Sequence, residues 1–172
     1  MKSIKSIAAL VLVCSIVALM LAVTNYFTAP TIAENEAKAV QKALLQVMPE
    51  GGTFEKVDSS ELSLPKMVSE IYRASNGGYV FKLKTKGQNT GLIIMCGVNP
   101  DGTVSGASCI ASKEDLQHEK TYGERFGGLD FAGVEKVDTI SQATKTTKAY
   151  KEAVKTALEV AAQLNGGEAD EK

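Results

Sequence analysis

The 172-residue chain has no tryptophan, one histidine and three cysteines. So few histidine and cysteine side chains leave no room for a zinc cluster of the usual kind or for a disulfide framework. Basic side chains are not in excess either, because 19 lysine and arginine residues face 20 aspartate and glutamate residues, for a net charge of −1. This balance argues against a nucleic-acid-binding surface over the whole chain. The hydrophobic content of 44% excludes a fully disordered chain, and the length suits one domain.

One stretch near the N-terminus carries no charge at all, because residues 6–33 form 28 consecutive uncharged positions. Its apolar centre, Ile7–Val23, together with the residues up to Phe27 reaches the roughly 20 residues that a helix needs to cross hydrocarbon about 30 Å thick. Tyr26 at the far end suits the membrane interface. A cleaved signal peptide is the competing interpretation, but the apolar run exceeds the usual length of about 7–15 residues, and no small-x-small cleavage site follows it. We therefore predict an uncleaved transmembrane anchor over residues 6–27.

The charges around this anchor predict its orientation. Lys2 and Lys5 precede the apolar run, and basic residues favour the cytoplasmic side of a membrane. We expect a single-pass protein of the cell (inner, cytoplasmic) membrane that contacts lipid through this helix and whose C-terminal domain is extracytoplasmic. The expected parts are a cytoplasmic N-terminus, the anchor, a juxtamembrane helix, a folded domain and a polar tail: residues 1–5, 6–27, 28–50, 51–165 and 166–172.

The residues after the anchor predict an α+β fold, in which helices flank an antiparallel sheet. Apolar residues recur at helical spacing up to Val47, and Pro30 suits the first turn of a juxtamembrane helix. The C-terminal helix is the clearest element, because Thr146–Leu164 places its apolar side chains on one stripe. Four short runs partly alternate or are rich in β-branched and apolar residues, and they predict strands at 67–72, 79–84, 92–95 and 103–110.

A turn sequence, Asn99–Gly102, predicts a hairpin between the last two of these strands. If the hairpin is centred on that turn, Cys96 lies opposite about Ser105. Cys96 and Cys109 then lie on one face of the sheet but too far apart along the strands for a disulfide bond. We interpret both as thiols within strands.

The segment before the C-terminal helix, Asp138–Thr147, is rich in hydroxyl groups. The structural interpretation is helix capping, in which Asp138, Ser141 or Thr144 accepts hydrogen bonds from the free amides of the first turn. The functional interpretation is anion binding, because free amides and the positive end of a helix dipole favour phosphate. Four lysines add positive charge near the start of this helix: Lys145, Lys148, Lys151 and Lys155.

The pattern Asp-x-x-Ser-x-Ala-Thr-x-Thr at 138–146 resembles the flavinylation motif Asp-x-x-(Ser/Thr)-Gly-Ala-Thr of the FMN-binding domains in the Rnf and Na⁺-translocating NADH:quinone reductase complexes. In that family the hydroxyl of the last threonine forms a phosphoester with FMN, and a flavin transferase makes the bond with FAD as donor. The resemblance implies that Thr144 is the attachment residue of covalent FMN. It also implies a cofactor-binding role for the other motif residues and for one tyrosine that could stack on the flavin: Asp138, Ser141, Ala143, Thr146 and Tyr122.

Other parts of the chain extend the resemblance. Residues 24–34 resemble the anchor and stalk of the RnfG family, and the glycine-punctuated hairpin at 97–106 is similar to a hairpin of the family. Residues 118–123 differ from the Glu-Thr-Pro-Gly-Leu-Gly loop that lies near the flavin in the family. Gln142 stands where the family has glycine. If position 142 requires a positive φ, glutamine costs about 1 kcal/mol there.

The resemblance implies an electron-transfer subunit of a membrane-bound, ion-translocating ferredoxin:NAD⁺ oxidoreductase (Rnf) complex. Such a subunit carries FMN and is not expected to be catalytic alone or to bind a metal. Its expected partners are the other membrane subunits and the flavin transferase, with no nucleic acid. Two alternatives stay open: a flavin-free, membrane-anchored scaffold subunit, and an extracytoplasmic flavoprotein that carries electrons alone. Bound flavin separates the first alternative from the leading hypothesis, and co-purification with other membrane subunits separates the second.

Overall fold

The computed structural model describes residues 2–58, 64–113 and 121–167. The chain divides into two compact units, Met1–Gln41 and Lys42–Lys172, and each is described by itself.

The first unit is helical. Helix α1 (Lys2–Val47) passes through Pro30 without a break and ends in the second unit. The boundary expected between an anchor ending at residue 27 and a separate juxtamembrane helix is therefore not a break in the helix. A proline inside a helix removes only one backbone hydrogen bond, and the helical pattern of apolar residues continues on both sides of it.

The segment Leu10–Thr28 of α1 is long and apolar enough to cross a membrane, in agreement with the predicted anchor. Its two threonines satisfy their hydroxyl groups inside the helix. Thr24 donates to the carbonyl of Met20 at 2.8 Å, and Thr28 donates to the carbonyl of Thr24 at 2.9 Å. Such internal bonds remove the need for water around these hydroxyls, which suits a segment within or at the edge of a bilayer.

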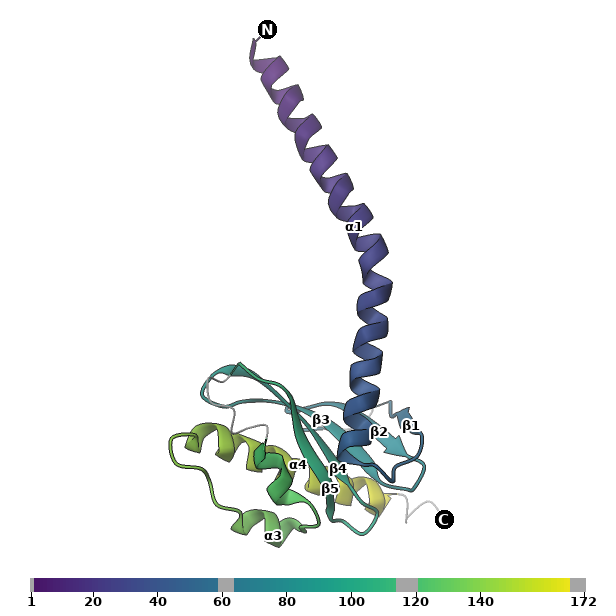
Figure 1. Cartoon of the computed structure of the whole chain (residues 1–172), viewed down its shortest axis with the longest axis vertical. Helices are drawn as coiled ribbons and strands as arrows, with labels where there is room; N and C mark the ends of the chain where they lie inside the picture. Colours follow the sequence, from purple (N-terminus) through teal and green to yellow (C-terminus); the bar gives the residue numbers. More distant parts are fainter. Residues whose placement is uncertain (1, 59–63, 114–120, 168–172) are drawn as a thin grey trace. The chain divides into compact units, whose positions relative to one another are not determined.

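Five strands form one antiparallel sheet in chain order, which confirms the predicted α+β class (Figure 1). The strands are β1 (Phe54–Lys56), β2 (Val68–Ala74), β3 (Tyr79–Lys86), β4 (Thr90–Val98) and β5 (Val104–Ala111). The last four match the four predicted strands within a few residues. The sequence carries no signal for β1, because three residues are too few to show an alternating pattern.

The β4–β5 hairpin forms as predicted, but its predicted register is wrong. Cys96 pairs with Ala107 instead of Ser105. The register shifts between Gly97 and Val98, so Ser105 is the extra residue of a β-bulge. One extra residue moves every later pair along the strand.

Helices cover the face of the sheet that holds the core (Figure 1). Helix α4 (Thr144–Gly167) packs across β3 and β4, and α3 (Phe131–Lys136) packs against α4. The short 3₁₀ helix η1 (Gly123–Phe126) packs against β5. The apolar stripe predicted for the C-terminal helix is buried, and the largest fully buried side chains of this core are Tyr122, Tyr150, Phe81, Phe126, Ile71, Leu83, Leu92 and Ile94.

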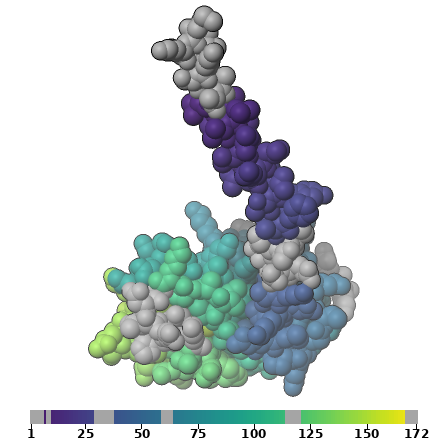
Figure 2. Space-filling model, turned by 45° about the horizontal axis from the view of Figure 1, so that its top comes forward, coloured from purple at the N-terminus to yellow at the C-terminus, as the bar shows by residue number. Residues whose placement is uncertain are grey.

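The opposite face of the sheet receives the last turns of α1. Gly97 and Gly106 lie directly opposite each other in β4 and β5. A Cβ atom on either glycine would lie 2.8 Å from the carbonyl oxygen of Val47, so only glycine lets the helix approach this closely. In Figure 2 the blue segment that follows residue 42 lies against the teal strands. The folded unit therefore begins at Lys42, earlier than the expected residue 51.

Candidate functional site

The hydroxyl-rich segment forms a tight turn immediately before α4. The amide of Ala143 donates to the carbonyl of Ile140 at 3.1 Å, which closes a four-residue turn. Gln142, the third residue, has a φ of 69°, and no other non-glycine residue of the described chain has a positive φ. A positive φ at the third position alone defines a type II turn, where glycine is strongly preferred. Glutamine costs about 1 kcal/mol at this position.

The first turn of α4 has free amides. Ala143 occupies the N-cap position, because its carbonyl accepts the first helical bond, from the amide of Thr147 at 2.9 Å. In the part of the chain that the structure describes, no side chain accepts a hydrogen bond from the amides of Thr144, Lys145 or Thr146. The capping interpretation is therefore not realised by the described side chains. These three donors are available to an anion.

The hydroxyl groups of this segment differ sharply in exposure. Thr144 and Ser141 are exposed, whereas Thr146 and Thr147 are only 5% and 1% exposed. The Thr144 hydroxyl makes a long contact of 3.4 Å to the carbonyl of Ile140. On α4 itself, Thr144 is therefore the threonine of the motif that an external reagent can reach.

Two of the four lysines on α4 are occupied in holding α3. Lys151 donates to the carbonyls of Glu135 and Val137 at 2.6 and 3.1 Å, which satisfies the C-terminal end of α3. Lys155 forms an ion pair with Glu135 at 3.1 Å and lies 5.1 Å from the ring centre of Phe131. These lysines stabilise the packing of two helices.

The other two lysines lie at the start of the helix. Lys145 and Lys148 are exposed, and within the described residues neither forms an ion pair. The first turn of α4 holds no acidic residue that could offset them. Lys148 lies four residues after Thr144 and hence on the same side of the helix. Positive side chains at the positive end of a helix dipole are unfavourable unless an anion is nearby.

Tyr122 lies in the core and not at the surface expected of a ring that stacks on flavin. Its side chain is fully buried, and its ring meets Phe126 and Tyr150 edge to face, with centroids 5.2 and 5.6 Å apart. Its hydroxyl donates to the carbonyl of Asp138 at 3.1 Å. Burial raises the pKa of this hydroxyl, which keeps it protonated as a donor. Tyr122 thus reaches the motif only through the backbone.

The fold also brings a hairpin loop to the motif that the sequence did not indicate. The amide of Gln88, between β3 and β4, donates to the hydroxyl of Thr146 at 3.3 Å. Asn89 in the same loop donates to the carbonyl of Lys113 at 2.9 Å. Local sequence patterns carry no signal for a contact across 58 residues. Of the segment 118–123, which stands in the place of the family's flavin loop, positions 118–120 lie outside the described residues.

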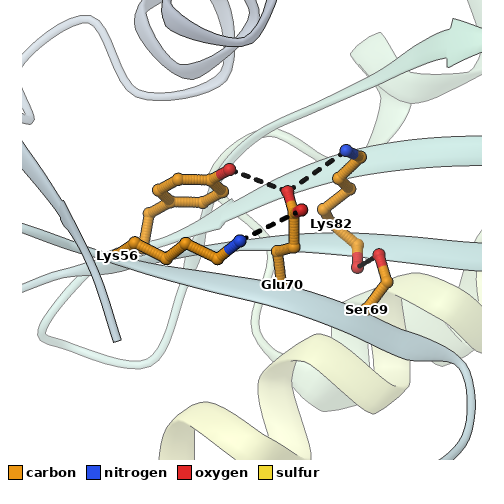
Figure 3. A network of polar contacts seen from close by, with 5 residues as sticks. Lys56, Ser69, Glu70 and Lys82 are labelled. Atoms are coloured by element: carbon orange, nitrogen blue, oxygen red, sulfur yellow. Dashed lines mark hydrogen bonds and ion pairs between the residues drawn. The ribbon is translucent and has the colours of Figure 1, made fainter. Parts of the chain in front are cut away.

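A second polar cluster lies on β1, β2 and β3, on the sheet face opposite the core (Figure 3). We call it the Glu70 cluster. The Glu70 carboxylate accepts hydrogen bonds from Tyr72, Lys82 and Lys56 at 2.7, 3.1 and 3.2 Å. Partial burial acts to raise the pKa of Glu70, but these three hydrogen bonds outweigh it and hold the pKa at about 2. The acceptor is satisfied from within the protein, so this cluster is structural.

Comparisons with known proteins agree with the motif. Residues 2–47, the extent of α1, match the family described as RnfG N-terminal region. Residues 87–159, from the β3–β4 loop through most of α4, match the FMN-binding domain family. The chain is similar to the RnfG-type component of the Na⁺-translocating ferredoxin:NAD⁺ oxidoreductase complex of Acetobacterium woodii, with 26% identity over 91% of this chain and 90% of that protein. The chain belongs to the RnfG-type FMN-binding domain proteins.

Proposed function

We propose that the protein is an electron-transfer subunit that carries FMN as a phosphoester on Thr144, within an Rnf-type ferredoxin:NAD⁺ oxidoreductase complex. One observation carries this proposal. Thr144 is an exposed hydroxyl at the first residue of α4, beside three amides that have no described side-chain acceptor, within the FMN-binding domain. Bound FMN supplies the redox chemistry, while the protein holds and orients it.

The residues around Thr144 fit a flavin phosphate. The amides of Thr144, Lys145 and Thr146 can donate to its oxygens, and the side chains of Lys145 and Lys148 can neutralise its charge. In the attachment step, the Thr144 oxygen forms a bond to the FMN phosphorus of FAD while the phosphoanhydride bond to AMP breaks. The hydroxyl proton is released, AMP leaves, and nothing is oxidised or reduced. A flavin transferase is the expected maturation partner.

The other motif residues have supporting parts in this proposal. Gln142 retains the left-handed conformation that suits the family's glycine, so the turn that presents Thr144 keeps its shape. Ser141 is exposed next to it and can contact the cofactor. Tyr122 supports the site through the carbonyl of Asp138.

Membrane attachment and partners follow from the N-terminal helix and from the relative. Leu10–Thr28 can cross a bilayer, and Lys2 and Lys5 before it favour a cytoplasmic N-terminus with the flavin domain outside. The relative from Acetobacterium woodii is one component of a multi-subunit complex, so we propose the other membrane subunits of such a complex as partners.

The test is the intact mass and the in-gel flavin fluorescence of the denatured full-length protein after co-expression with a flavin transferase. We expect a mass gain of one FMN less one water, which disappears in Thr144→Ala. Thr156→Ala is the matched control, because Thr156 lies on the same helix and bonds only to the carbonyl of Glu152. No mass gain, while a glycine-containing member of the family is labelled in parallel, would favour the flavin-free scaffold. Labelling without co-purification of other membrane subunits would favour a carrier that acts alone.

A further inference from the structure

Thr147 lies outside the motif that resembles the family, yet its side chain contacts the motif turn at both ends. Its hydroxyl accepts a hydrogen bond from the amide of Ile140 at 3.3 Å and donates to the carbonyl of Ala143 at 3.0 Å. Ile140 and Ala143 are the first and last residues of the turn. Thr147 is 1% exposed, so it does not touch a ligand at the surface.

The turn that Thr147 spans is the strained part of this segment. Gln142 within it adopts a positive φ, which L-residues with a side chain adopt only at a cost. If Gln142 relaxed to a helical φ, α4 could extend backwards through the turn. The amide of Thr144 would then bond to the carbonyl of Ile140, as in any helix interior, and would no longer be free. The hydroxyl of Thr144 already lies 3.4 Å from that carbonyl.

We propose that Thr147 is a positioning residue for flavin attachment: its hydroxyl holds the Ile140–Ala143 turn in the left-handed form and so keeps the hydroxyl and amide of Thr144 presented. This inference rests on the proposed attachment of FMN to Thr144. It assigns Thr147 no contact with the cofactor. Because the strain comes from Gln142, the need for Thr147 is tied to that side chain. With glycine at position 142 the turn keeps its shape by itself, and Thr147 becomes dispensable.

The test measures the initial rate of FMN incorporation into the full-length protein, by intact mass, with a fixed amount of flavin transferase and FAD. Thr147→Val keeps the shape of the side chain and removes the hydroxyl. We expect attachment to slow about tenfold, which corresponds to about 1.4 kcal/mol. Thr147→Ser should restore the rate to within about twofold, because serine offers the same donor and acceptor. Thr156→Val, the same change on the same helix away from the motif, should leave the rate unchanged.

The decisive variants carry the change in two backgrounds. In Gln142→Gly, Thr147→Val should slow attachment by less than about twofold, since glycine removes the strain. A merely structural role of Thr147 would slow attachment by the same factor in both backgrounds, and that result would overturn the inference. If Thr147→Val folds only in the Gln142→Gly background, the coupling is supported; if it folds in neither, the positioning role is refuted.

Failure of this inference is distinguishable from failure of the proposed function. If the unchanged protein takes up no FMN while a glycine-containing relative does, the attachment to Thr144 is wrong. If the unchanged protein is labelled and Thr147→Val is labelled at the same rate, only the role of Thr147 is wrong.

Discussion

The Glu70 cluster and the start of α4 are both rich in charge and hydrogen-bonding groups, but they treat those groups in opposite ways. In the Glu70 cluster three donors converge on one carboxylate, and two of them are the lysines Lys56 and Lys82. At the start of α4, Lys145 and Lys148 have no ion-pair partner among the described residues, and three amides have no side-chain acceptor there. The first region is complete without a ligand, whereas the second is completed by an anion.

The difference teaches how to separate structural from functional polar clusters. A satisfied cluster stabilises the fold, because its removal leaves buried groups without partners. An open cluster contributes little to the fold or opposes it, so its presence points to a ligand. Substitutions in the two regions should therefore have opposite effects on the free energy of unfolding and on FMN attachment.

The largest effect on stability is expected in the Glu70 cluster. Glu70→Leu leaves Tyr72 and Lys82 without their acceptor, and the side chain of Lys82 is only 19% exposed. We expect a loss of about 2 kcal/mol in the free energy of unfolding, measured with urea, and an unchanged rate of FMN attachment. Glu70→Gln, which keeps one acceptor oxygen, should lose about half as much. A fall in attachment as large as that caused by Thr144→Ala would remove the distinction between the two regions.

The same carboxylate predicts an acid dependence. The pKa of Glu70 is about 2 in the folded protein and 4.5 without the fold, so the folded state favours the ionised form. Its contribution is complete above about pH 4.5 and is lost as the pH falls toward 2. We expect about 1 kcal/mol, since Glu70 is partly exposed to solvent. Urea unfolding at pH 6 and pH 3 should show this loss in the unchanged protein and a smaller loss in Glu70→Gln. Equal losses would place the acid dependence elsewhere.

A smaller effect of opposite sign is expected at position 142. Gln142→Gly removes the strain of a positive φ but gives the unfolded chain more freedom, which leaves a net gain of about 0.5 kcal/mol. Gln163→Gly is the matched control, because Gln163 is exposed within α4, and glycine costs about 1 kcal/mol in a helix interior. Urea unfolding of the two variants should give changes of opposite sign. Destabilisation by both would mean that Gln142 is not strained in solution.

The sequence predicted the parts of this molecule that depend on local patterns. The apolar stripe located α4, the uncharged run located the membrane segment, and the spacing of the motif placed Thr144 at the start of a helix. Contacts between distant segments left no such pattern. Nothing near Gln88 indicates its bond to Thr146, and a single extra residue, Ser105, shifted the register of a correctly predicted hairpin. The positive φ at position 142 was a condition that only the structure could confirm.

The smallest effect on stability is expected at the two open lysines. Replacing Lys145 and Lys148 by glutamine removes positive charge from the positive end of the α4 dipole. We expect stability to rise by a few tenths of a kcal/mol, about 0.3 for each residue. FMN attachment should slow nevertheless, because the phosphate loses two cations. Lys151→Met, on the same helix, should do the reverse, since the carbonyls of Glu135 and Val137 lose their donor.

The two sets of variants must be measured together at low salt, where exposed charges act most strongly. If the lysine-to-glutamine pair lowers stability as Lys151→Met does, Lys145 and Lys148 have structural partners and the start of α4 is not open. If the pair raises stability and attachment is unaffected, the region is open but the phosphate does not use these cations. Only a gain in stability together with slower attachment fits a helix start whose charges are arranged for a bound anion, because the same two charges then oppose the fold and favour the ligand.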